Sequence, residues 1–499
     1  MKSDPKPAVA RTEPALPRIF AGLFGAFLGL SLLKFGNPPI MEKWVSPPAD
    51  IYEFLLASPW PIAWAYWLLG MIGVVGLLAA CRIAGAPRWL LALPLIWLLW
   101  QFLAGAQSVD AELARATLKH FTACVVCFYL GFFPLGRIAR PWPFWIGLLL
   151  GFALVVAVGW EQHFGGLAES RRYFFTYVYP HLAEVPPGYL QKMASNRIFS
   201  TLFYPNALAG VLLLLLPASL ATIWQTRPWL SAGARRFLIV TITVAALGCL
   251  YWSGSKGGWL LMLWLGLVAL LRLRLGKPFK AALLTAVLLA GLAGFFWRYS
   301  AFFHKGATSV SARFDYWRAA LQTAKEKPIF GTGPGTFAIP YQKIKRPEAE
   351  MSRLVHNDYL EQATDSGVPG LLTYVAFIVG ALVWSYPQSS PRSATTLPPR
   401  PRSRPPPRHA SDPPYPGTAA RQAEEKDENE DETARGTMDD WQTFSVWLGV
   451  LGWSLQGLLE FGLYIPALAW PAFALFGRLS ATKWAGLRPD TQFDNEGLH

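Results

Sequence analysis

Charged residues are scarce in this sequence. Asp, Glu, Lys and Arg make up 15% of its 499 residues, whereas hydrophobic residues make up 53%. Soluble domains carry about 25% charged residues, and the charges present here are clustered, which leaves long stretches with almost none. Runs of about 18 or more apolar residues are long enough to cross a bilayer as a helix. The composition therefore argues against an ordinary soluble protein and predicts an integral membrane protein.

Cysteine is also rare, with four residues that lie in or beside apolar runs. Cys124 and Cys127 form a Cys-x-x-Cys pair inside such a run, so we interpret them as small helix residues rather than a redox or metal site. We expect no metal and no cofactor. The net charge of +14 would indicate nucleic acid in a soluble protein. Here the basic residues lie mainly in short loops between apolar runs, so we expect membrane lipids as partners and no nucleic acid.

The apolar runs predict an all-α polytopic membrane protein with about 12 transmembrane helices and a helical loop on one side. Spans must be helices because lipid offers no hydrogen-bond partner to an exposed backbone. The predicted spans are residues 17–36, 60–81, 88–105, 113–134, 142–162, 199–224, 236–253, 257–272, 280–298, 367–386, 441–459 and 462–480.

The short loops predict the orientation, because Lys and Arg favour the cytoplasmic side. Alternate loops are basic, and the last span is followed by a basic tail, whereas the intervening short loops hold mainly acidic residues. The basic residues are Arg82, Arg88, Arg137, Arg140, Arg227, Arg235, Arg236, Arg272, Arg274, Lys277, Lys280, Arg478, Lys483 and Arg488. Both termini are therefore expected in the cytoplasm.

Long segments interrupt this pattern and divide the chain. Residues 1–298 hold spans one to nine, with an outside loop over 163–198. Residues 299–366 form a larger outside loop, and span ten covers 367–386. Residues 387–440 are rich first in Pro and Arg and then in acidic residues, which predicts a disordered cytoplasmic insert. The last two spans cover 441–480, and 481–499 form a cytoplasmic tail.

The larger outside loop carries an amphipathic pattern and a glycine-rich stretch. Phe314, Trp317, Leu321 and Ala324 fall on one face of a predicted helix that Ser311 would cap and that ends before Pro328. Residues 330–337 (Phe-Gly-Thr-Gly-Pro-Gly-Thr-Phe) form a turn-rich stretch. Its backbone N–H groups could bind an anion, but a plain tight turn is the simpler explanation, and the stretch lacks the Lys-Ser/Thr of a nucleotide-binding loop.

Three polar residues on the expected outer side have chemical potential. His356 lies beside Asn357 just before span ten, and a histidine near carboxylates can act as a base near neutral pH. Lys256 lies alone in a tight outside turn, and Arg197 lies at the entrance to span six. A structural histidine and snorkelling cations are the simpler alternatives. Together the three suit a lipid-linked diphosphate, since cations neutralise a leaving pyrophosphate and a base deprotonates an incoming hydroxyl.

The same residues resemble the motifs of the O-antigen ligase and polymerase family of bacterial envelope proteins. His356 and Asn357, followed after nine residues by Gly367-Val-Pro-Gly370, have the form H-N-x9-G-x-x-G. The other matching stretches are Arg313…Trp317…Pro328-Ile-Phe-Gly-Thr-Gly-Pro-Gly-Thr-Phe, Arg197…Pro205-Asn206 and Ser253-Gly-Ser-Lys256-Gly-Gly. The family usually has Arg where this chain has Lys256, which keeps the charge but loses the bidentate fork.

The resemblance implies a fold like the GT-C type and a metal-independent glycosyltransferase in the bacterial inner membrane. The enzyme would move a glycan from undecaprenyl diphosphate to a sugar hydroxyl of lipid A-core at the periplasmic face. His356 would be the base, and Arg197 and Lys256 would hold the diphosphate. Arg313 or Arg318 would assist, with support from Asn206, Asn357 and Glu460. A polymerase of the same family that extends a lipid-linked glycan or an exopolysaccharide, a protein-glycosylating member of the family, and a polytopic transporter remain alternatives.

Overall fold

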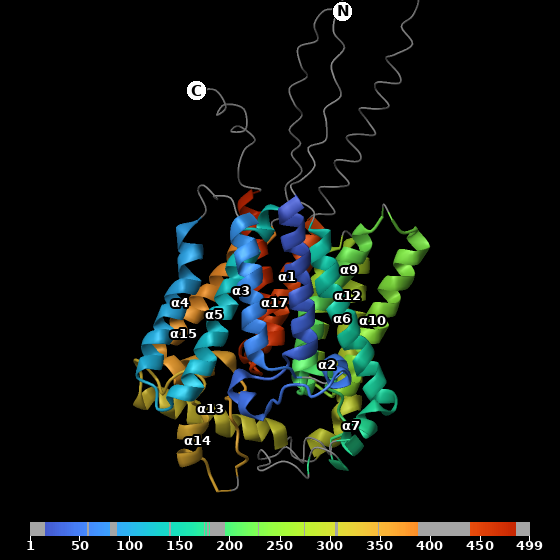
Figure 1. Ribbon diagram of the computed structural model, residues 1–499. Helices are drawn as coiled ribbons and strands as arrows, with labels where there is room; N and C mark the ends of the chain where they lie inside the picture. The colour runs from blue at the N-terminus through green and yellow to red at the C-terminus, as the bar shows by residue number, and fades with distance from the viewer. Residues whose placement is uncertain are drawn as a thin grey trace, which may run out of the picture.

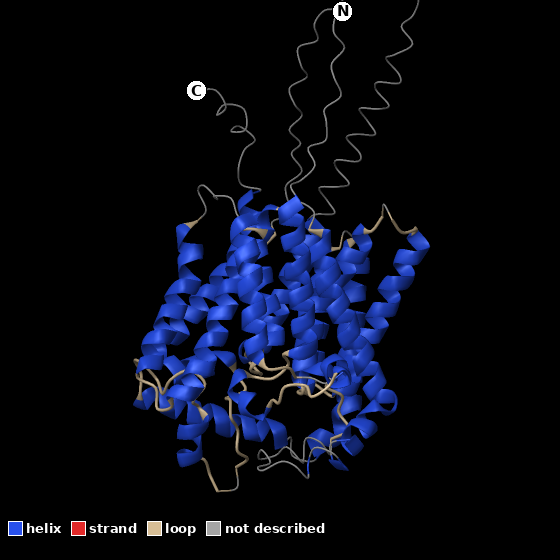
Figure 2. Ribbon diagram, viewed as in Figure 1, coloured by secondary structure: helices blue, strands red, loops and turns tan. Residues whose placement is uncertain are grey.

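A computed structural model describes residues 15–56, 59–79, 87–138, 141–173, 175–176, 179, 195–227, 229–273, 275–304, 308–347, 349–387 and 440–485. These residues form helices and connecting loops, and no strand occurs among them (Figure 2). Most of the predicted insert 387–440, parts of the predicted loop 163–198 and most of the predicted tail 481–499 lie outside the described residues.

Each of the twelve predicted spans coincides with a helix. These helices are α1 (Ala15–Lys34), α3 (Ile62–Ala79), α4 (Arg88–Ala106), α5 (Ala111–Phe132), α6 (Trp142–Glu161), α9 (Pro205–Gln225), α10 (Ala232–Ser253), α11 (Lys256–Arg272), α12 (Lys277–His304), α15 (Asp358–Trp384), residues 440–456 and α17 (Pro466–Ala485). In the described part of the chain, nine helices are long and apolar enough to cross a membrane. The predicted all-α polytopic fold is therefore confirmed, and the chain is a multi-pass membrane protein.

The remaining elements are short, except α13. They are η1 (Pro39–Trp44), α2 (Ile51–Leu56), η2 (Leu135–Arg137), η3 (Gln162–Gly166), α7 (Leu167–Tyr173), η6 (Ser200–Leu202), α13 (Thr308–Glu326), α14 (Ala338–Ile344) and η7 (Gly462–Tyr464). α2, α7, α13 and α14 lie together at one end of the helix bundle, the lower end in Figure 1. We call this end the loop end, and the candidate site lies there.

Glycines bring α1 and α6 into backbone contact. Gly25 and Gly29 on α1 face Gly147 and Gly151 on α6, and both pairs have the Gly-x-x-x-Gly spacing. A Cβ on Gly25 would lie 2.2 Å from the carbonyl oxygen of Phe144, and one on Gly29 would lie 2.2 Å from that of Gly147. Small residues at such a spacing allow membrane helices to pack closely, so these four glycines determine the distance between the two helices.

α9 lies deep in the bundle and carries a site residue. Of the nine apolar helices, α9 has 72% of its apolar window buried, against 6% for α12. α9 begins at Pro205 and not at the predicted residue 199, because residues 199–204 form η6 and a left-handed turn at Phe203. Asn206 therefore lies in the first turn of a buried helix, at its loop-end terminus.

The amphipathic helix α13 is present, and its most buried residues lie outside the predicted apolar face. Tyr316, Ala319 and Ala320 are buried, in contact with Phe337 and Tyr341, whereas Phe314 and Leu321 are exposed. The helix also begins at Thr308, so Ser311 is not its cap. Next to a membrane an exposed apolar face is stable toward lipid.

The glycine-rich stretch is a packing turn, because its N–H groups are already bonded. Thr332 N–H donates to the Thr364 carbonyl over 2.8 Å, and Gly333 N–H donates to that of Asp365 over 2.9 Å. Gly331, Gly333 and Gly335 all have positive φ, and a Cβ on Gly331 would lie 2.3 Å from the Thr364 oxygen. The expected alternative of a plain turn is therefore the better reading, since these N–H groups are not available to an anion.

α15 begins at Asp358, nine residues before predicted span ten, and is interrupted at Gly367, where φ is +70°. Asp365, before the interruption, is fully buried. Its Oδ2 accepts hydrogen bonds from Gly335 N–H over 2.6 Å and from the Tyr464 hydroxyl over 2.7 Å. Gln362 donates to the same hydroxyl over 2.9 Å. We call Asp365, Gly335, Tyr464 and Gln362 the Asp365 cluster; it joins the glycine-rich turn, α15 and η7.

Candidate active site

His356 lies in a strained turn directly before α15. Its φ is +57°, in the left-handed region that costs a non-glycine residue free energy. Asn357 caps α15, accepting from Tyr359 N–H over 3.1 Å and Leu360 N–H over 3.0 Å. The Asn357 amide also donates to the Leu458 carbonyl over 2.9 Å. Asn357 therefore fixes the backbone on which His356 is presented, and its side chain is occupied by these contacts.

The loop that follows helix 440–456 is attached to the start of α15. Asp358 N–H donates to the Gly457 carbonyl over 2.7 Å, and the Asp358 carboxylate accepts from Leu463 N–H at 3.2 Å and 3.0 Å. On the far side, His120 of α5 contacts the Leu463 carbonyl over 2.8 Å. Glu460, in the middle of this loop, is consequently held opposite His356.

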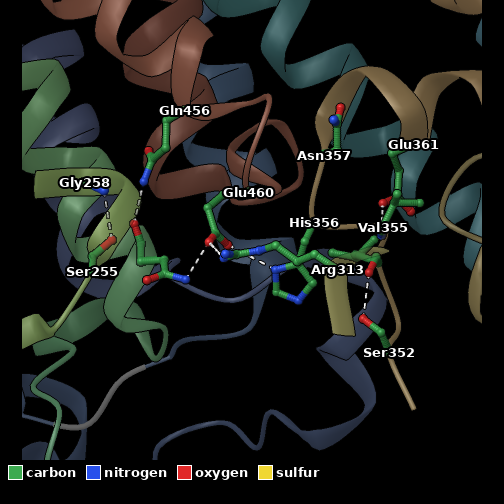
Figure 3. A network of polar contacts seen from close by, with 12 residues as sticks. Ser255, Gly258, Arg313, Ser352, Val355, His356, Asn357, Glu361, Gln456 and Glu460 are labelled. Atoms are coloured by element: carbon green, nitrogen blue, oxygen red, sulfur yellow. Dashed lines mark hydrogen bonds and ion pairs between the residues drawn. The ribbon is translucent and has the colours of Figure 1, made fainter. Parts of the chain in front are cut away.

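Glu460 is the centre of a polar network that unites four of the predicted residues (Figure 3). His356 Nδ1 lies 3.1 Å from its Oε2, and Asn206 Nδ2 donates to its Oε1 over 2.5 Å. Arg313 of α13 forms an ion pair with the same Oε1. We call Glu460, His356, Arg313, Asn206 and Arg197 the Glu460 cluster; Asn206 and Glu460, which are in direct contact, lie 254 residues apart in the sequence.

Arg197 joins this cluster through Asn206. Its Nη2 donates to Asn206 Oδ1 over 2.9 Å, and its Nε donates to the Ser253 carbonyl over 2.6 Å. Burial lowers the pKa of Arg197, while the charge of Glu460 opposes that shift. The guanidinium is therefore held in a partly dry position between the turn before α9 and the end of α10.

The Glu460 carboxyl is 11% exposed and remains ionised. Burial would raise its pKa, but the hydrogen bond from His356 and the charges of Arg313, His356 and Arg197 outweigh burial and lower the pKa below the usual value. A carboxylate can only accept hydrogen bonds, so the neutral imidazole must carry its proton on Nδ1. The lone pair of a neutral His356 is then on Nε2.

A cavity of about 430 Å³ opens beside the cluster. Arg197, Asn206, His356 and Glu460 line it, together with residues of η1 and of the segment 350–354. Tyr316 also lines it and stacks on His356 with ring centroids 5.7 Å apart. Burial raises the pKa of Tyr316 to about 12, so the phenol stays neutral. The cluster thus faces a space with room for a substrate group, which makes it the candidate active site.

Lys256 and Arg318 have different positions from the other predicted cations. Lys256 does not line the cavity; it begins α11, with its Nζ 3.8 Å from the Phe302 ring centroid and 5.2 Å from that of Tyr299. Arg318 is 64% exposed and lies 4.0 Å from Asp315. α13 therefore directs Arg313, at 22% exposed, into the cluster and Arg318 away from it.

Several cavity residues carry no sequence signal of their own. Gln456 donates to the Asn206 carbonyl over 2.7 Å, Phe461 packs edge-on against His356 with centroids 4.7 Å apart, and Arg353 lies over Trp44. Only proximity in space marks them, although Arg353 lies three residues from His356. Among the described residues no group of three His, Cys, Asp or Glu side chains is arranged to hold a metal ion.

Comparison with known proteins identifies a relative and a family model that match parts of this chain. A protein of Haemophilus influenzae, named only as uncharacterized, is 29% identical over 165 residues, which cover 28% of this chain and 40% of that protein. The chain thus matches less than half the length of this curated relative. The family model described as O-antigen ligase matches residues 241–375, the stretch that contains Lys256, Arg313 and His356. The predicted resemblance is therefore confirmed: residues 241–375 of this membrane protein match the O-antigen ligase family.

Proposed function

We propose that this protein transfers a glycan from undecaprenyl diphosphate to a sugar hydroxyl of lipid A-core, at the periplasmic face of the bacterial inner membrane. The observation that carries the proposal is the contact between His356 and an ionised Glu460 on the wall of a cavity that Arg197 also lines. This arrangement provides a base, a group that orients the base, and a cation beside the same space. The loop end is taken to be periplasmic and the termini cytoplasmic, in line with the positions of Lys and Arg in the short loops.

His356 acts as the general base. Glu460 accepts the Nδ1–H, which leaves the Nε2 lone pair for the proton of the acceptor hydroxyl. As that proton moves to Nε2, the oxygen forms a bond to the anomeric carbon of the donor sugar, and the bond from that carbon to the diphosphate oxygen breaks. The imidazolium that forms lies next to the Glu460 carboxylate, which stabilises it. Direct attack of this kind inverts the anomeric configuration.

Cations stabilise the negative charge that develops on the leaving undecaprenyl diphosphate. Arg197 has a guanidinium at the cavity wall, and Lys256 lies close enough to Arg197 and Arg313 for their charges to act on it. Arg313 acts through Glu460 and is a positioning residue. Such charge-assisted contacts are roughly twice as strong as neutral hydrogen bonds. Because the diphosphate linkage is itself activated, the reaction uses no nucleotide, and the family resemblance implies that it uses no metal.

A reconstituted transfer assay tests the proposal. The purified full-length protein receives an undecaprenyl-diphosphate glycan together with lipid A-core, or with more lipid-linked glycan alone. We expect wild type to attach the glycan to lipid A-core, and His356→Ala to remain folded without activity. Elongation of the lipid-linked glycan alone would instead indicate a polymerase. Flux of glycan across a vesicle membrane without any covalent product would indicate a transporter.

Lys256 provides a second arm of this assay. Lys256→Ala should lower transfer by about tenfold to a hundredfold, because a charge-assisted contact to the diphosphate is lost. Lys256→Arg should retain most activity, since the family usually carries Arg at this position and the charge is preserved. Full transfer by both His356→Ala and Lys256→Ala would reject the proposed site. Complete loss in Lys256→Arg would show that Lys256 acts through something other than its charge.

A further inference from the structure

Arg353 is a second cation on the cavity wall, on the segment that leads to His356. Its guanidinium carbon lies 4.2 Å from the centroid of the Trp44 ring, and Trp44 also lines the cavity. Within the described parts of the chain, no hydrogen bond uses the Arg353 guanidinium as donor. Its five N–H donors therefore remain for a ligand.

The Trp44 ring supports this guanidinium from one side. A stacked arginine turns its flat face to the ring and leaves the N–H groups at its edge free, which suits planar or bidentate oxygen pairs. The Lys43 ammonium lies 4.5 Å from the centroid of the same ring, so cations cover Trp44 and the indole acts as a support for Arg353. Burial lowers the pKa of Arg353, and an anion beside it would offset the lost hydration.

Arg353 forms a charge centre separate from the Glu460 cluster. The electrostatic neighbours of Arg197 are Glu460, Tyr299 and Arg313, whereas that of Arg353 is Tyr204. His356 lines the same cavity as both. A diphosphate bound beside Arg197 and Lys256 would therefore leave Arg353 for a different anionic group on the other substrate.

We infer that Arg353 binds an anionic substituent of the acceptor glycan, a phosphate or a carboxylate, and that Trp44 is the residue that positions it. The inference rests on the proposed function, because the acceptor hydroxyl must then reach His356. It adds a source of acceptor specificity: a glycan whose charged group pairs with Arg353 would have its neighbouring hydroxyls in the cavity.

Kinetics with two matched acceptors test this inference. One acceptor is lipid A-core with its phosphates and carboxylates. The other is the same glycolipid after phosphatase treatment and reduction of its carboxylates to alcohols. Arg353→Gln should raise KM for the charged acceptor about tenfold to a hundredfold, with kcat, donor KM and KM for the neutral acceptor unchanged. The KM of Arg353→Lys for the charged acceptor should lie between those of wild type and Arg353→Gln, because lysine keeps the positive charge but loses the bidentate fork of the guanidinium.

Substitutions of Trp44 test its positioning role separately. Trp44→Leu should raise KM for the charged acceptor in the same direction as Arg353→Gln, and Trp44→Phe should restore most of the affinity because a ring face remains. Arg346→Gln, an exposed arginine of the same loop that does not line the cavity, is the matched control and should leave every parameter within about twofold.

The outcomes separate this inference from the proposed function. A rise in donor KM in Arg353→Gln would make Arg353 a diphosphate ligand and overturn the inference. Equal changes with both acceptors, or none, would also overturn it. Isothermal titration of soluble core oligosaccharide into the full-length protein needs no transfer. If wild type does not transfer, weaker binding by Arg353→Gln would still support the subsite, and equal binding would reject it.

Discussion

Two polar clusters lie at the loop end, and they differ in access rather than in chemistry. The Glu460 cluster and the Asp365 cluster each have a buried carboxyl that accepts two or more hydrogen bonds, and both use residues of the segment that follows helix 440–456. The partners of Asp365 are a backbone N–H and a tyrosine hydroxyl, and none of these residues lines the 430 Å³ cavity. The partners of Glu460 are a histidine, an arginine and an asparagine, on or next to the wall of the 430 Å³ space.

This difference distinguishes a polar cluster that stabilises the fold from one that can take part in a reaction. A carboxyl that closes a turn against a helix needs only to be satisfied. A carboxyl that orients a histidine beside an open cavity has a partner that can exchange a proton with a substrate. Sequence motifs include both kinds: the H-N-x9-G-x-x-G stretch contains His356 of one cluster and Asp365 of the other.

The largest expected effect is on Glu460. Glu460→Gln keeps the shape but removes the charge that stabilises the imidazolium and pairs with Arg313. We expect kcat to fall at least about a hundredfold while the protein stays folded. Asp365→Asn, the same chemical change in the other cluster, is the control and should leave kcat within a few-fold. Similar losses of kcat in both variants would mean that the two clusters are not functionally distinct.

Asp365 should instead affect stability. Asp365→Ala leaves the Gly335 N–H and the Tyr464 hydroxyl without an acceptor in a fully buried site, and each such loss costs about 1–3 kcal/mol. Thermal unfolding of the purified protein should show a clearly lower midpoint, with near-normal kcat per folded molecule. Asp315→Ala, which removes a half-buried carboxyl of α13 that pairs with the exposed Arg318, is the control and should shift the midpoint little. An unchanged midpoint in Asp365→Ala would contradict the structural role.

The sequence predicts the spans and most of the residues in the cluster, for two different reasons. Lipid imposes a length and an apolar composition on every span, so each predicted span coincides with a helix. Cations and a histidine are conspicuous where the surroundings are apolar, which directs attention to Arg197 and His356. The pairings themselves are beyond sequence reasoning, since the Asn206–Glu460 contact joins residues 254 positions apart.

Local geometry explains the remaining differences. Arg313 and Arg318 are five residues apart, so on a helix at about 100° per residue their directions differ by roughly 140°. Both cannot face one cluster, and the sequence does not say which one does. The apolar pattern of α13 places Phe314 and Leu321 on one face, and both are exposed. Tyr316, which stacks on His356, lies on the other face and was not anticipated.

Lowering the pH should weaken the Glu460 cluster only at pH values below the usual pKa range of a carboxyl group. The pKa of Glu460 is lowered in the folded protein, so its stabilising contribution is complete above the unfolded pKa of about 4.3. The contribution is lost as pH falls through the lower folded pKa. The difference in unfolding midpoint between wild type and Glu460→Gln should therefore stay constant from about pH 6 to 8 and shrink below about pH 4. A difference that shrinks near neutral pH would show that the carboxyl is not held ionised.

The smallest effect is expected for Arg318, which is compared with Arg313 on the same helix, α13. Arg318 is exposed and lies 4.0 Å from Asp315, and exposed pairs contribute about 0–1 kcal/mol, so Arg318→Gln should leave kcat and KM within about twofold. Arg313→Gln removes the ion pair that holds the Glu460 carboxylate in place. The hydrogen bond between Glu460 and His356 Nδ1 is then less well oriented, so kcat should fall more than tenfold. Both variants make the same chemical change, Arg to Gln, and both lie on α13. Equal losses in both would mean that α13 contributes general positive charge to the substrate, whereas a loss in Arg313→Gln alone attributes its contribution to the orientation of Glu460.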